Sequence, residues 1–148
     1  MKCKNPIALV ACLACLGLVT GCPGGGGSSS NPPPTGPAAQ NLNGKTLSVT
    51  VSSGAAPFST GGTYTLVTTS GDGTSGRYQL NGNGGVQSNS GTYTYSVTGA
   101  NTSSLVETED INGTVVNNTL TFQSATSGTI ASTSPNKGGF QNGSFTLN

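Results

Sequence analysis

The 148-residue sequence contains no histidine and no tryptophan, and only 6% of its residues are charged. Without histidine, neither a Ser-His-Asp nor a Cys-His catalytic arrangement can form. A zinc site built from the usual nitrogen and sulfur ligands is not expected either. Cysteine is absent after residue 22, since the four cysteines are Cys3, Cys12, Cys15 and Cys22. The long C-terminal part therefore has no internal disulfide bond, and its stability must come from packing and hydrogen bonding.

Basic residues are also scarce once the first few positions are passed. After residue 21 the sequence has only Lys45, Arg77 and Lys137, against four acidic residues. Because nucleic-acid binding requires clusters of Lys and Arg that neutralise phosphates, we expect no nucleic-acid partner. A Ser–Lys catalytic pair would need a desolvated lysine, whereas both lysines stand beside glycines typical of turns. We therefore expect neither an enzyme nor a cofactor.

The N-terminus has the pattern of an export signal. Lys2 and Lys4 precede the apolar run 7–19, and Thr20 and Gly21 separate the end of this run from Cys22. As a helix this run would extend roughly 20 Å at about 1.5 Å per residue. That is too short for a bilayer core of about 30 Å, so the run does not predict a transmembrane helix. A short apolar run with a basic flank is typical of a removable signal peptide.

The sequence Val19-Thr20-Gly21-Cys22 resembles the lipobox of bacterial lipoproteins. The resemblance implies that the Cys22 thiol receives a diacylglyceryl group, that cleavage follows Gly21, and that the new amino group is acylated, for example with palmitate. Cys12 and Cys15 are rival positions, but they lack a long enough apolar run or a suitable preceding residue. An ordinary secretory signal with a chance cysteine is the other alternative. Pro23 stands where an aspartate would signal inner-membrane retention, so we expect the outer membrane.

Three segments are predicted from the change in composition along the chain. Residues 1–21 form the signal peptide, and residues 22–41 form a lipidated tether rich in Gly, Ser and Pro. Such a tether is flexible in its glycine half and extended in its proline half. Residues 42–148 form a single domain, which is an ordinary size for one domain.

The domain is predicted to be all-β because apolar residues alternate with Thr and Ser at a period of two. Leu47, Val49 and Val51 give one of the clearest examples. Comparable segments lie at 63–68, 78–80, 93–97, 120–122 and 145–147, with weaker ones at 104–110 and around residue 130. Asn-Gly and Asp-Gly pairs, typical of tight hairpin turns, are predicted between strands at Asp72, Asn81, Asn83, Asn112 and Asn142.

About eight such strands predict an antiparallel meander, closed as a small lipocalin-like barrel, with a β-sandwich as the alternative. Residues 91–130 also resemble a segment of exported bacterial proteins of unassigned function. The resemblance is carried by Gly-Thr-Tyr-Thr-Tyr at 91–95, Leu-Thr-Phe at 120–122 and Ser-Ala-Thr-Ser-Gly-Thr at 124–129. It implies a β-meander in an envelope protein and carries no activity with it.

The acidic residues Glu107, Glu109 and Asp110 form the sharpest chemical candidate. In a strand, Glu107 and Glu109 point to the same side with Cα atoms about 6.5 Å apart. Two carboxylates at such a distance can cleave glycosidic bonds, and with Asp110 they could hold calcium through oxygen ligands. The alternative is that they are solvated charges at the end of a strand.

Four tyrosines are predicted to face the interior: Tyr64, Tyr78, Tyr93 and Tyr95. They either fill a small barrel or line a pocket for a small apolar ligand. Together these patterns predict a monomeric, membrane-anchored envelope lipoprotein whose domain has a binding or structural role. Its partner would be another envelope protein, a glycan or a small apolar ligand. The alternatives are a lipocalin-like carrier of an apolar ligand and, more distantly, a glycosidase or a calcium-binding module.

Overall fold

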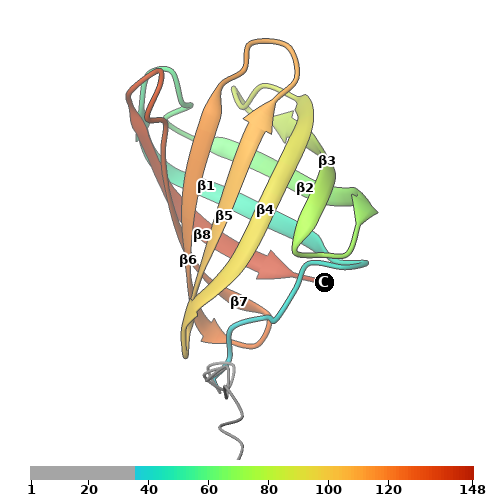
Figure 1. Ribbon diagram of the computed structural model, residues 1–148. Coiled ribbons are helices and arrows are strands. Elements are labelled where there is room, and N and C mark those ends of the chain that lie inside the picture. The colour runs from blue at the N-terminus through green and yellow to red at the C-terminus, as the bar shows by residue number, and fades with distance from the viewer. Residues whose placement is uncertain (1–35) are drawn as a thin grey trace, which may run out of the picture. The chain divides into compact units, whose positions relative to one another are not determined.

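The computed structural model describes residues 36–148, in which every regular element is a β-strand (Figure 1). The predicted signal peptide, Cys22 and residues 22–35 of the predicted tether lie outside the described residues. The eight strands are β1 (Thr46–Ala55), β2 (Gly62–Gly71), β3 (Ser75–Asn83), β4 (Asn89–Gly99), β5 (Thr102–Glu109), β6 (Val115–Ser124), β7 (Ser127–Thr133) and β8 (Phe140–Leu147). Within residues 36–148, no helix is long and apolar enough to cross a membrane.

The strands form a closed antiparallel barrel in chain order. Each strand pairs with the next, and β8 pairs back with β1, as in the register Val49 opposite Phe145. The all-β, eight-stranded meander predicted from the sequence is confirmed, and it closes as a barrel and not as a sandwich. Closure satisfies the backbone of every strand and leaves no edge strand exposed.

Period-two alternation places one set of side chains inside the barrel. On β1, Leu47, Val49 and Val51 are buried, while Thr50 and Ser52 between and beyond them are exposed. The same alternation runs through β5 and β7, the two strands for which the sequence pattern is weakest. The inward set is therefore determined by the pattern of the sequence.

An up-and-down barrel collects alternate loops at opposite ends. Loops 56–61, 84–88, 110–114 and 134–139 lie at one end, here called the mouth, which is uppermost in Figure 1. Loops 72–74, 100–101 and 125–126 lie at the other end, here called the base. Each end of the interior can thus be described separately.

The base half of the interior is apolar and well filled. Leu66, Leu105 and Leu120 are fully buried there. The rings of Phe122 and Phe145 meet edge to face, with centroids 5.0 Å apart. This geometry is the one that aromatic pairs prefer in a packed core.

A segment before β1 covers the base. Leu42 is 1% exposed, its backbone N–H donates to the carbonyl of Gly73 at 2.8 Å, and its own carbonyl accepts from Thr68 Oγ1 at 3.1 Å. Ala38 also belongs to the core, and the Tyr95 hydroxyl donates to the carbonyl of Ala39 at 2.6 Å. Contacts with the barrel thus extend before Leu42, to residues that composition alone groups with the tether.

Two of the five predicted turn pairs are not turns. The pairs that begin at Asp72, Asn83 and Asn112 do lie at turns, but those that begin at Asn81 and Asn142 lie inside β3 and β8. A Cβ on Gly82 would stand 2.2 Å from the carbonyl oxygen of Val86, and one on Gly143 would stand 2.4 Å from that of Thr50. Gly82 therefore permits close approach of the loop after β3, Gly143 permits close approach of β1, and neither glycine forms a hairpin turn.

Candidate functional site

The mouth half of the interior is polar, in contrast to the base. Four neighbouring strands each place a polar side chain at an inward position: Glu107 from β5, Asn118 from β6, Ser132 from β7 and Gln141 from β8. All four are buried. Because adjacent strands hold their side chains in fixed register, these groups form one continuous polar wall.

Asn118 organises this wall through three hydrogen bonds. Its amide nitrogen donates to Glu107 Oε1 at 2.7 Å and to the carbonyl of Leu105 at 3.1 Å. Its amide oxygen accepts from Ser132 Oγ at 2.6 Å. Since the oxygen is engaged by Ser132, the nitrogen is held toward the carboxyl group. The position of the Glu107 side chain is thereby fixed.

Glu107 is a carboxyl group inside the protein, with 4% of its surface exposed. The pKa of Glu107 is raised to about 8, mainly by burial; the hydrogen bond from Asn118 lowers this pKa, and the charge of Glu109 raises it. Burial and the Glu107 charge also raise the pKa of the Tyr64 hydroxyl. A buried carboxyl group usually has a cationic partner, because desolvation of an isolated charge is costly.

A cavity of about 110 Å³ lies at the mouth, between the polar wall and two loops. Its polar lining includes Tyr64, Asn89, Glu107, Glu109, Asn118 and Gln141. Loops 56–61 and 84–88 add Phe58 and Val86 to the rim. None of the three basic residues in the described part of the chain lines this cavity. Two carboxyl groups therefore share one cavity without a protein cation.

Two polar atoms beside these carboxyl groups have no hydrogen-bond partner within the described residues. One is Asn89 Oδ1, which is buried although the amide nitrogen of the same side chain donates to Glu109 Oε1 at 2.9 Å. The other is the hydroxyl of Tyr78, whose side chain is 1% exposed and feels the charges of Glu107 and Glu109. An unpaired buried acceptor or hydroxyl is unfavourable, so both atoms indicate a place for a ligand or water.

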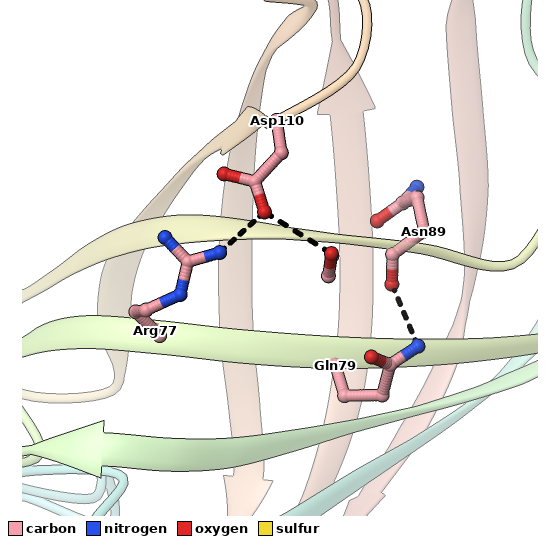
Figure 2. A network of polar contacts seen from close by, with 5 residues as sticks. Arg77, Gln79, Asn89 and Asp110 are labelled. Carbon is pink, nitrogen blue, oxygen red and sulfur yellow. Dashed lines mark hydrogen bonds and ion pairs between the residues drawn. The ribbon is translucent and has the colours of Figure 1, made fainter.

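Asp110 is separated from the other two acidic residues. It lies just beyond β5, where its carboxylate forms an exposed ion pair with Arg77 and accepts from Ser90 Oγ at 3.1 Å (Figure 2). Beside this pair, Gln79 Nε2 donates to the backbone carbonyl of Asn89 at 3.1 Å. Within residues 36–148, no group of three or more acidic, His or Cys residues is arranged to hold a metal ion. Of the proposed calcium ligands, only Glu107 and Glu109 share the cavity.

The four tyrosines divide between the two halves of the barrel. Tyr64 lines the mouth cavity, and Tyr78 lies in the core close to the carboxyl groups of the mouth. Tyr93 and Tyr95 belong to the core, and the Tyr95 hydroxyl is paired with Ser103 Oγ at 2.8 Å as well as with the base segment. Only the first of the four thus lines the cavity directly.

Several residues of the site escape the sequence analysis, namely Asn89, Asn118, Ser132 and Gln141. A signal for two of them was present in the alternation. Asn118 is two residues before the inward Leu120, and Ser132 is two residues after the inward Ile130. A polar residue at an inward strand position is a departure from the apolar pattern, and such departures indicate functional positions.

The outer surface has a separate open hollow of about 550 Å³. It is lined largely by outward-facing hydroxyl side chains of β1, β2 and β8, among them Ser48, Thr50, Thr65, Ser144 and Thr146. These are the threonine- and serine-rich faces expected from the sequence. They supply hydrogen-bonding groups but no charge.

Comparison of the chain with models of known protein families gives no match, and comparisons with curated proteins and with solved structures give none either.

Proposed function

We propose that this protein is a lipid-anchored envelope lipoprotein whose barrel is a binding module with its ligand site at the mouth. The observation that carries the binding role is a cavity with two carboxyl groups in its wall, Glu107 and Glu109, over a filled apolar core. A barrel with a purely structural role has no need of a buried carboxyl group beside unpartnered polar atoms, because such groups weaken the fold. Binding of a ligand would compensate this cost.

The volume of the cavity favours a small ligand, and the carboxyl groups in its wall favour a polar ligand over an apolar one. Sites for drug-sized molecules occupy about 300–1,000 Å³ and are mostly apolar. The mouth cavity holds about 110 Å³ and is lined by Glu107, Glu109 and Asn118. A carrier of the lipocalin type would need a larger and drier interior, so the carrier hypothesis is the weaker of the two.

Glycosidase activity has less support than binding. Cleavage of a glycosidic bond requires two carboxyl groups on opposite sides of the scissile bond, with a sugar ring between them. Glu107 and Glu109 extend from one strand into one small cavity, where they stand side by side. This arrangement suits joint contact with one small group.

Support for the anchor comes from the sequence. The apolar run followed by Val-Thr-Gly-Cys22 resembles a lipobox, and two or more acyl chains hold a protein stably on a bilayer. The Gly, Ser and Pro residues that follow would separate the barrel from the membrane surface. Pro23 after the cysteine favours the outer membrane in this proposal.

The anchor is tested by Cys22→Ser, with Cys12→Ser as the matched control. We expect the wild type and Cys12→Ser to sediment with outer membranes, and Cys22→Ser to lose this association. Mass spectrometry of the membrane-extracted protein should find residue 22 at the N-terminus with acyl chains attached. Unchanged sedimentation of Cys22→Ser, or an unmodified cysteine, would exclude a lipid anchor.

The binding role is tested separately by screening small polar molecules against the detergent-solubilised, ¹⁵N-labelled protein. A ligand of the mouth should shift amide signals of residues 107–109, 118 and 132 in a saturable way. Asn118→Leu should weaken that response, whereas the outward-facing Thr119→Ala should not. The absence of any saturable response at the mouth would leave the buried carboxyl group as a structural feature alone.

A further inference from the structure

The mouth cavity also specifies the chemistry of its ligand. Most polar atoms of the cavity that can still form a hydrogen bond are acceptors. Glu107 and Glu109 each receive one amide donor, and Asn89 Oδ1 receives none. Both hydrogens of the Asn118 amide are directed to Glu107 Oε1 and to the Leu105 carbonyl. The missing partner must therefore bring donors.

The charges around the cavity further limit the chemical class of the ligand. Two carboxyl groups line the cavity, and no basic residue of the described chain lies in its wall. The single ion pair found within residues 36–148 joins Arg77 to Asp110 on the outer surface. An alkylammonium group has three N–H donors, a positive charge and no acceptor, so it complements this set of atoms.

Size sets an upper limit on the part of the ligand that is enclosed. At about 30 Å³ for each water-sized group, a cavity of about 110 Å³ has room for roughly three or four non-hydrogen atoms. The rim residues Phe58 and Val86 offer apolar contact for a short carbon chain. A primary amine with a short alkyl group fits these limits.

We propose that the mouth of the barrel binds a small primary alkylammonium ion, with Glu109 and the deprotonated form of Glu107 as charge partners and Asn89 Oδ1 as a further acceptor. This inference rests on the proposed binding role of the mouth. The buried hydroxyl of Tyr78 is unpartnered but does not line the cavity, so a bound cation would satisfy it through water and not by direct contact.

The test is an NMR titration of the full-length, detergent-solubilised protein with ethylammonium chloride at pH 8.5, above the pKa of about 8 of Glu107, so that its carboxylate form predominates. Ethanol serves as the neutral probe of similar size, and tetramethylammonium as the cation without N–H donors. We expect saturable shifts of mouth signals with ethylammonium at millimolar concentration, and at least tenfold weaker responses to the other two. Equal responses to ethanol or to tetramethylammonium would overturn the proposal.

Variants locate the site. Glu107→Gln, which keeps size and hydrogen bonding but removes the charge, should weaken ethylammonium binding at least tenfold, and Asn89→Leu should weaken it by a smaller factor. Asp110→Asn, an acidic residue outside the cavity, should leave it unchanged. Unaltered affinity in both Glu107→Gln and Asn89→Leu, with thermal melts that show folded protein, would refute the assignment.

A parallel titration with calcium chloride separates an ammonium site from a metal site. Saturation of the same signals by calcium at lower concentration than ethylammonium, lost in Glu107→Gln, would replace the amine by a divalent cation. If ethylammonium fails while another molecule from the screen moves these signals, the binding role stands and the ammonium assignment falls.

Discussion

The base and the mouth of this barrel are built from the same eight strands, yet their interiors have opposite chemistry. On β5, Leu105 and Glu107 are successive inward residues, and both are buried. The first contacts other apolar side chains of the core, and the second faces a cavity with a second carboxyl group. Two residues along one strand, the interior thus changes from apolar groups that stabilise the fold to a buried carboxyl group that destabilises it.

The comparison shows how a small barrel, which has no cysteine within residues 36–148, can contain an unfavourable site. Closure of the sheet gives every strand two hydrogen-bonded neighbours, so the mouth does not need apolar side chains to keep its strands together. The base supplies the apolar burial, helped by Leu42 from outside the strands. Polar groups that serve binding can therefore occupy the mouth, because the base stabilises the fold.

The largest effect is expected at the base. Leu120→Ala removes a fully buried side chain and should lower the free energy of unfolding by about 2–5 kcal/mol. The neighbouring Thr119→Ala, exposed on the outer face, should change it by less than about 0.5 kcal/mol. Urea denaturation followed by circular dichroism measures both. Similar losses in the two variants would contradict a core at this end.

The second largest effect is expected in the dependence of stability on pH, which tests whether Glu107 at the mouth is a buried carboxyl group. The folded protein keeps a proton on Glu107 up to a pKa of about 8, whereas the unfolded chain releases it near 4.5. Folded protein thus binds more protons between these values, and stability should fall as pH rises from about 4.5 to 8 and then level off. The size is of the order of a few kcal/mol, since one pKa unit corresponds to about 1.4 kcal/mol.

Glu107→Gln isolates this contribution. It should flatten the pH dependence and make the protein more stable than the wild type at pH 8, because no buried charge forms. Asp110→Asn is the control and should retain the slope of the wild type. Urea denaturation midpoints measured from pH 5 to 9 give the dependence of stability on pH for each variant. If stability falls with pH as steeply in Glu107→Gln as in the wild type, Glu107 is not the group whose titration causes the fall.

A smaller effect is expected where the segment before β1 joins the base. Tyr95→Phe removes the hydroxyl that donates to the Ala39 carbonyl and contacts Ser103 Oγ, while it keeps the ring in the core. The loss should be about 1 kcal/mol, as for a typical buried hydrogen bond, and should increase hydrogen exchange at the amide of Ala38. Unchanged exchange there would show that the segment is held by apolar contacts alone.

The smallest effect is expected on the outer surface near the mouth. Arg77→Ala breaks the ion pair with Asp110, whose partners are both well exposed. Exposed ion pairs contribute about 0–1 kcal/mol and are screened by salt. Thermal melts in low and in high salt should show a difference that shrinks as salt increases. A loss as large as that of Leu120→Ala would be inconsistent with an exposed pair.

The strands were predictable from the sequence because alternation of apolar and polar residues reports the burial of a barrel wall directly. Even β5 and β7, with the weakest patterns, form where the residues around 104–110 and 130 indicate. Turn chemistry was less reliable. Asn81-Gly82 and Asn142-Gly143 have the residues of a hairpin turn, but Gly82 permits close backbone contact with the loop after β3 and Gly143 permits it with β1.

The site was only partly predictable. Glu107 and Glu109 could be identified from the sequence because neighbouring acidic residues are rare in this chain. Their common direction follows from strand geometry, in which alternate side chains lie on the same face. It does not reveal that Asp110 turns outward to Arg77, which depends on where β5 ends. The contribution of Asn89 and Asn118 depends on cross-strand register, which no local pattern specifies.

Pairing of β1 with β8 joins the first strand of the domain to its last, as the hydrogen bond from Ser52 Oγ to the carbonyl of Asn142 illustrates. A chain that emerges N-terminus first cannot complete this ring until its final strand is available. Contacts between residues so distant in sequence form slowly because the intervening chain must be ordered first. The circular connectivity therefore keeps the barrel open until β8 is available to pair with β1.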